Sequence, residues 1–238
     1  MDSNQRLRAL ADRFLELGRH INLSGAKDFD TLWSRHILDS LKLLELPELA
    51  KGSHVLDLGS GGGFPGLPLA IARPDLTVTL MDSVTKKMKA VQTLIDDLDI
   101  KNASVLVSRA EDLGRNKAHR QAYSVVVARA VAPLPALLEY AAPLTAIHGV
   151  FIAIQGPDAV NEVAEAEIAR QKLRVDVPKL HPYTMGDATF YHVVYPVRQY
   201  VPKAYPRTQG KPRKQPLGSQ KRKGQAKVED GAVGGSQQ

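Results

Sequence analysis

VLDLGSGGGF, residues 55–64, joins a short apolar run to a cluster of glycines. The apolar run predicts a buried strand. PGLPLAIA at residues 65–72 predicts a helix with proline in its first turn, where the missing N–H costs nothing. A strand that enters a glycine-rich turn and then a helix lets a ligand approach the backbone closely, because no Cβ stands in the way. The segment therefore predicts a binding turn for a nucleoside-type ligand.

The same alternation continues on the C-terminal side of the turn. It predicts an α/β fold with a doubly wound, mostly parallel, seven-stranded, Rossmann-like sheet. The last strand is expected to be antiparallel, because MGDA at 185–188 leaves no room for a crossover helix before it. Expected strands are 54–58, 76–82, 103–107, 123–128, 150–154, 173–177 and 190–197; expected helices are 65–72, 84–98 with Ser83 as its N-cap, 135–144 and 158–171.

The residues before the sheet predict two helices. Apolar residues recur with a helical period over residues 4–19, and a second helix is expected from Asp30 or Thr31, as its N-cap, to Pro47. Arg35 and Asp39 are four residues apart, a spacing that allows them to pair across one turn of that helix. The expected organisation is a small helical extension at 1–50, an α/β domain at 51–200 and a basic C-terminal tail at 201–238. The tail is expected to be extended up to about Leu217 and disordered beyond about 218.

Charge is distributed unevenly along the chain. The formal net charge is +7, and from Arg198 onward there are ten Lys and Arg against two Asp and Glu. The rest of the chain is thus nearly neutral. A basic tail is an electrostatic handle for polyanions such as nucleic acids, although a solubilising end is an equal alternative on charge alone.

Several classes of protein are excluded by composition. The absence of cysteine excludes disulfides, thiolate metal sites and cysteine nucleophiles, and it fits a reducing cytosol. The histidines show no spacing typical of metal ligands, so no metal is expected. The polar N-terminus has no apolar core of a signal peptide, and no apolar run approaches the ~20 residues of a membrane span. A soluble, cytoplasmic protein is expected.

Three acidic residues stand at the ends of successive predicted strands: Asp57, Asp82 and Glu111. An acidic residue at the position of Asp82 is suited to accept both hydroxyls of an adenosine ribose. Phe64 occupies the place of the third glycine in the dinucleotide pattern, which argues against NAD. The form Asp57-x-Gly59-x-Gly61 resembles instead the turn of S-adenosylmethionine-dependent methyltransferases.

The chain as a whole resembles the RsmG (GidB) family of guanine-N7 methyltransferases of bacterial small-subunit ribosomal RNA. The resemblance covers most of residues 6–217. The combination of RHILDS with GSGGGFPG is specific to this family. The matching segments are INLSG (21–25), RHILDS (35–40), VLDLGSGGGFPGLPLAI (55–71), LMDSVTKKMKAV (80–91), VSRAEDL (107–113), VVARAVAPL (126–134) and VPKAYPRTQGKPRKQPL (201–217).

This resemblance implies a methyl donor, a substrate and a set of site residues. The donor is S-adenosyl-L-methionine, and the partner is 16S ribosomal RNA or the small ribosomal subunit. The residues implied for donor binding are Gly59, Gly61, Phe64, Asp82, Ala110, Glu111 and Arg129. Gln155-Gly156 departs from the family pattern, because many relatives have a lysine before that glycine; a charge that this lysine would bring to RNA or to the methyl donor is missing here.

The implied chemistry does not require a catalytic base. Guanine N7 already carries a lone pair in the ring plane, and the Asn/Asp-Pro-Pro-aromatic motif of exocyclic-amine methyltransferases is absent after the fourth strand. Arg129 is interpreted as a positioning group for the donor carboxylate or an RNA phosphate, with an ordinary salt bridge as the alternative. His36 is either a buried structural histidine or a substrate contact.

Two other functions remain open on the sequence. One is a small-molecule methyltransferase on the same fold, against which the basic tail argues. The other is a non-catalytic RNA-binding assembly factor, against which the complete set of strand-end residues argues. Methylation of ribosomal RNA is the function that the sequence favours.

Overall fold

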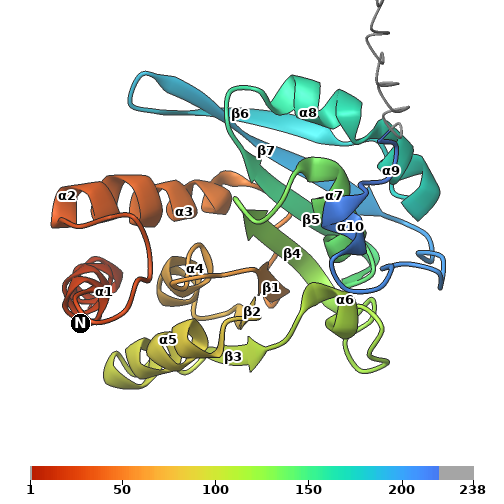
Figure 1. Cartoon of the computed structure of the whole chain (residues 1–238). Coiled ribbons are helices and arrows are strands. Elements are labelled where there is room, and N and C mark those ends of the chain that lie inside the picture. The colour runs from red at the N-terminus through yellow and green to blue at the C-terminus, as the bar shows by residue number, and fades with distance from the viewer. Residues whose placement is uncertain (1, 220–238) are drawn as a thin grey trace, which may run out of the picture.

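A computed structural model describes residues 2–219 of the chain. At its centre lies one sheet with the strand order β3-β2-β1-β4-β5-β7-β6 (Figure 1). Every neighbouring pair is parallel except β5–β7 and β6–β7, so β7 alone runs antiparallel to the rest. This confirms the expected sheet and its antiparallel final strand. The strands are β1 (His54–Leu58), β2 (Thr77–Asp82), β3 (Ala103–Val107), β4 (Tyr123–Arg129), β5 (Thr145–Gln155), β6 (Lys179–Met185) and β7 (Ala188–Val197).

Helices cover both faces of the sheet and bury a separate apolar cluster on each. Figure 1 shows α1 to α5 on one side and α6 to α10 on the other. The first group is α1 (Ser3–Gly18), α2 (Phe29–Leu32), the π-helical turn η1 (Trp33–Leu38), α3 (Asp39–Leu41), the 3₁₀ turn η2 (Lys42–Glu45), α4 (Gly66–Ala72) and α5 (Thr85–Asp97). The second is α6 (Ala110–Leu113), α7 (Leu134–Ala141), α8 (Ala159–Glu165), α9 (Glu167–Leu173) and α10 (Lys211–Lys214).

The two N-terminal helices form where the sequence places them, but the predicted start of the second is wrong. Asp28, rather than Asp30 or Thr31, is its N-cap, because the Asp28 carboxylate accepts a hydrogen bond from the Thr31 backbone N–H at 2.8 Å. Aspartate and threonine are both good caps, so composition alone does not choose between them. The helix then passes through η1, and π-helical turns are frequent at functional sites.

The sixth strand also differs from the prediction. Residues 173–177 are not a strand: Leu173 ends α9, Arg174 adopts a left-handed conformation with φ of 59°, and Val177 is exposed. The strand is instead β6, at the edge of the sheet. Pro182 lies inside it, and an edge strand tolerates a proline that a central strand would not.

Ser83 is not the N-cap of α5 as predicted. The cap residue is Val84, which makes no side-chain capping bond. The Val84 backbone N–H donates to the Asp82 carboxylate at 2.9 Å. The acidic end of β2, rather than the serine after it, thus satisfies a donor at the start of this helix.

The C-terminal segment packs against the second face of the sheet. The Arg120 guanidinium donates to the carbonyl oxygens of Val201, Pro202 and Tyr205. The segment was expected to be extended as far as Leu217, but it contains the short helix α10, and Leu217 is buried. Residues 220–238, most of the stretch predicted to be disordered, lie outside the described residues. Within residues 2–219, no helix has the length and apolar character needed to cross a membrane.

Candidate active site

The glycine turn after β1 is fixed by the neighbouring strand. The backbone N–H groups of Gly59 and Ser60 both donate to the Met81 carbonyl, at 2.7 and 2.9 Å. Gly59 has φ of 73°, and a Cβ there would lie 2.6 Å from the Val131 side chain. Gly61 has φ of 57°, but a Cβ there would meet open space. The turn therefore needs glycine at 59 for its own packing, and at 61 it leaves the backbone open to a ligand.

Asp82, at the end of β2, connects the turn to α5. Its carboxylate accepts hydrogen bonds from the backbone N–H of Gly61 at 3.1 Å and of Val84 at 2.9 Å. A carboxylate offers about four acceptor positions, so two remain for a ligand. Two adjoining cavities border the turn, and Asp82 lines both.

Asp57 lies beneath the turn rather than in a cavity. It is 1% exposed; one carboxylate oxygen accepts from the Gly66 N–H at 2.7 Å, and the other has no partner among the described residues. Burial raises the pKa of Asp57 to about 7, against the lowering effects of the Gly66 hydrogen bond and the Arg129 charge. Of the three acids at strand ends, Asp82 and Glu111 therefore reach the cavities and Asp57 supports the turn.

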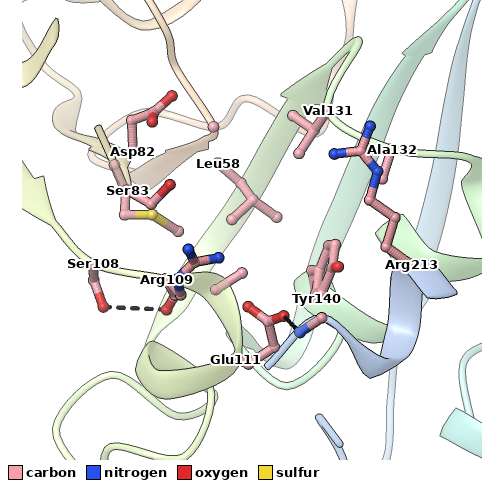
Figure 2. Close-up of a pocket in the computed structure, with 14 residues that line it drawn as sticks. Leu58, Asp82, Ser83, Ser108, Arg109, Glu111, Val131, Ala132, Tyr140 and Arg213 are labelled. Carbon is pink, nitrogen blue, oxygen red and sulfur yellow. Dashed lines mark hydrogen bonds between the residues drawn. The ribbon is translucent and has the colours of Figure 1, made fainter. Parts of the chain in front are cut away.

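The first cavity, of about 250 Å³, lies over the ends of β1, β2 and β4 (Figure 2). Leu58, Val131, Ala132 and Tyr140 supply apolar walls, while Asp82 stands on one side of the cavity and Glu111 on another. The remaining lining residues are Gly59, Met81, Ser83, Ser108, Arg109, Ala110, Gly210 and Arg213. A flat, partly apolar group with hydroxyls at one end matches this lining.

A second cavity, of about 360 Å³, shares Gly59, Asp82 and Val131 with the first. It is lined by Leu23, Ser24, His36, Gly59, Ser60, Gly61, Gly62, Phe64, Asp82, Lys87, Arg129, Ala130 and Val131. The seven residues that the sequence predicts for the donor site thus all line one of two adjoining cavities.

Arg129, at the end of β4, is held by the N-terminal helices. Its guanidinium donates to the Asp39 carboxylate at 2.7 Å, to the Arg35 carbonyl at 3.1 Å and to His36 Nδ1, with 2.8 Å between the nitrogens. Tyr183 donates to the other Asp39 oxygen at 2.7 Å. The pairing of Arg35 with Asp39 that their spacing allows is therefore not formed, because Arg129 reaches the carboxylate from the sheet and both sides of that ion pair are largely buried.

Part of the first cavity comes from residues that sequence reasoning missed. Glu111 accepts a hydrogen bond from the Gly210 backbone N–H at 2.8 Å, and Arg213 lines the same cavity (Figure 2). The basic composition of the tail predicted a contact with a polyanion or a solubilising end, not a wall of this cavity. Gly210, which precedes Lys211-Pro212, has φ of 73° and so forms a turn that glycine favours. Gln155 ends β5 opposite Tyr191 and lines neither cavity.

The two cavities fit an adenosyl compound. Their sizes together match the range of pockets for ligands of this kind. In the first cavity, the free acceptor positions of Asp82 and the apolar walls at Val131 and Tyr140 suit the hydroxyls and the flat base of a nucleoside. Between residues 2 and 219, no group of three or more His, Asp or Glu side chains is arranged to hold a metal ion.

A family model described as rRNA small subunit methyltransferase G (GidB) matches residues 3–188. The chain belongs to this family. Relatives named ribosomal RNA small subunit methyltransferase G include one from Lactobacillus johnsonii, 38% identical over 87% of this chain and 88% of its own length. One from Roseiflexus sp. is 41% identical over 83% of this chain and 84% of its own length.

Solved structures agree at the level of the fold. A SAM-dependent methyltransferase from Aquifex aeolicus superposes with a TM-score of 0.53 at 18% identity, covering 70% of this chain and 93% of its own. The fold is thus that of enzymes that use S-adenosylmethionine. The chain is an S-adenosylmethionine-dependent methyltransferase of the rRNA small subunit methyltransferase G family.

Proposed function

We propose that the chain transfers the methyl group of S-adenosylmethionine to N7 of a guanine in 16S ribosomal RNA, in the cytoplasm. The observation that carries the proposal is the convergence of all seven predicted site residues on two adjoining cavities in a chain of this family. The excess positive charge from Arg198 onward supports a polyanionic partner.

The two cavities bind different parts of the methyl donor. In the first, Asp82 accepts the ribose hydroxyls and Glu111, together with Ala110, receives the adenine. In the second, the open Gly61 backbone and the Lys87 ammonium face the charged amino-acid end of the donor. Gly210 and Arg213 close the first cavity, so the C-terminal segment belongs to the donor site as well as to the RNA-binding surface.

Most of the rate enhancement comes from positioning the methyl donor and guanine N7 relative to each other. Bound S-adenosylmethionine supplies a methyl group activated by a positively charged sulfur, and guanine N7 presents a lone pair that needs no deprotonation. The chain therefore has to hold the two reactants in line rather than move a proton. Arg129, fixed by Asp39 and the Arg35 carbonyl, and the Phe64 ring give the second cavity rigid walls.

The single-turnover rate is expected to change less than about twofold between pH 6 and 9, because no base has to ionise. The pKa of His36 lies at about 4, below this range, since burial and the Arg129 charge lower it. Asp57→Asn is the control, because the pKa of Asp57 falls within the range. A steep rise in rate that survives in Asp57→Asn would reveal a catalytic base and contradict the account.

Asp82→Ala is expected to weaken S-adenosylmethionine binding about ten- to a hundredfold, because a charged acceptor of two hydroxyls is lost. The loss includes the support that Asp82 gives to the Gly61 turn. Asp82→Asn keeps one acceptor oxygen, so its affinity for S-adenosylmethionine is expected to lie between those of Asp82→Ala and the wild type. Calorimetric titration measures the affinities, and an unchanged value for Asp82→Ala would remove this residue from the donor site.

The substrate is tested by methyl transfer from labelled donor to naked 16S RNA, to intact small subunits and to free guanosine. Transfer to RNA or to subunits, and none to guanosine, is the expected result. Their relative rates identify which of the two is the substrate. Transfer to guanosine at an equal rate would indicate a small-molecule methyltransferase instead.

A further inference from the structure

His36 is held in one orientation by residues far from it in the sequence. It lies on η1, its Nδ1 is 2.8 Å from a guanidinium nitrogen of Arg129, and its ring packs against Phe64 with 5.2 Å between centroids. Arg129 is itself fixed by the Asp39 carboxylate. The imidazole ring therefore has little freedom to turn.

The contact with Arg129 also fixes which nitrogen carries the proton. An arginine side chain only donates hydrogen bonds, so Nδ1 of His36 must accept. The hydrogen of the neutral ring is then on Nε2. Burial first, and the Arg129 charge second, lower the pKa of His36 to about 4, so the ring is neutral near pH 7.

The Nε2–H group is available to a ligand. His36 lines the second cavity. Among the described residues, none accepts a hydrogen bond from its Nε2. The same cavity already offers the Lys87 ammonium to an anionic group such as the donor carboxylate. Since Lys87 supplies the positive charge that pairs with the donor carboxylate, the neutral Nε2–H remains for an acceptor on the second reactant, such as a carbonyl oxygen.

The two purines differ at the edge that carries N7. Guanine presents two acceptors, N7 and O6, whereas adenine presents N7 beside an N6 amino donor. When N7 faces the methyl donor, the group next to it is O6 in guanine and an amino group in adenine. A fixed N–H at that place would favour guanine and oppose adenine, because two donors would face each other.

We propose that the Nε2–H of His36 donates a hydrogen bond to O6 of the target guanine and selects guanine over adenine. The proposal rests on the proposed function and adds a specificity-determining residue to it. His36→Phe removes the donor. His36→Gln keeps it, because the amide oxygen can accept from Arg129 while the amide nitrogen donates into the cavity.

The experiment compares single-turnover rates on two RNAs. One is unmodified 16S RNA; the other carries 2-aminopurine, which lacks O6, at the position that the wild-type protein methylates. In the wild type, the rate on guanine divided by the rate on 2-aminopurine reflects both the His36 hydrogen bond and the intrinsic difference in N7 reactivity. In His36→Phe, the same ratio reflects only the difference in N7 reactivity. The ratio is expected to fall by about three- to tenfold in His36→Phe and to be kept in His36→Gln.

Equal ratios in the wild type and His36→Phe would overturn the proposal. An affinity for S-adenosylmethionine reduced tenfold in His36→Phe would also overturn it, because His36 would then belong to the donor site. If His36→Phe does not fold, His36→Leu takes its place in the same comparison. No transfer to RNA by the wild type would instead contradict the proposed function itself, so the two failures are distinguishable.

Discussion

Replacing Arg207 by alanine is expected to lower the free energy of unfolding by about 3–5 kcal/mol, because it removes the partner of a buried carboxylate. Glu139 on α7 is fully buried, and its oxygens accept hydrogen bonds from the Arg207 backbone N–H at 2.8 Å and from its guanidinium at 2.6–3.1 Å. Without the guanidinium, Glu139 must either stay charged without its pair or take up a proton.

The matched control is Arg198→Ala. Arg198 pairs with Asp176 at 3.2 Å, but the two side chains are 62% and 38% exposed, so the expected loss is under about 1 kcal/mol. Chemical denaturation measures both variants. A loss of unfolding free energy in Arg207→Ala as small as that in Arg198→Ala would show that Glu139 does not depend on the Arg207 guanidinium. Because Arg207 holds the segment that carries Gly210 and Arg213, Arg207→Ala is also expected to weaken donor binding.

Asp57→Asn is expected to stabilise the donor-free protein increasingly as the pH rises from 4 to 7. The folded pKa of about 7 exceeds the ordinary aspartate value of about 3.9, so unfolding releases a proton across this range and wild-type stability falls with rising pH. Asparagine cannot ionise, and its side-chain oxygen can still accept from the Gly66 N–H. The advantage is expected to reach up to about 4 kcal/mol, at about 1.4 kcal/mol for each unit between the two pKa values.

The measurement is a series of denaturation curves for the wild type and Asp57→Asn between pH 4 and 8. The difference in unfolding free energy should grow up to about pH 7 and then stay constant. A difference that does not change with pH would show that Asp57 ionises normally beneath the turn.

The glycine turn and its acidic neighbours could be predicted because their signals are local. Gly59, Gly61 and Asp82 each stand at a fixed place relative to a strand end, and the carboxyl ends of parallel strands meet at one edge of the sheet. The wrong sixth strand has a local cause as well. Pro182 argues against a strand until the edge position of β6 is known, whereas Leu173, Val175 and Val177 alternate as a strand would.

The remaining features of the site depend on contacts between distant residues. Arg129 and His36 are 93 positions apart, and Glu111 and Gly210 are 99 apart. No periodicity or spacing reports such a contact, so Arg35 was the nearest available partner for Asp39 on sequence grounds. The role of the C-terminal segment in the first cavity could not be predicted for the same reason, since its charge indicated only a nucleic-acid surface or a solubilising end.

Nucleoside analysis of 16S RNA, after incubation with the protein and methyl-labelled S-adenosylmethionine, tests the transfer of methyl to guanine N7 directly. Label is expected in 7-methylguanosine alone, with strongly reduced incorporation at limiting donor concentration for Asp82→Ala. Label in another nucleoside, or no label with folded wild-type protein on either naked RNA or small subunits, would contradict transfer to guanine N7.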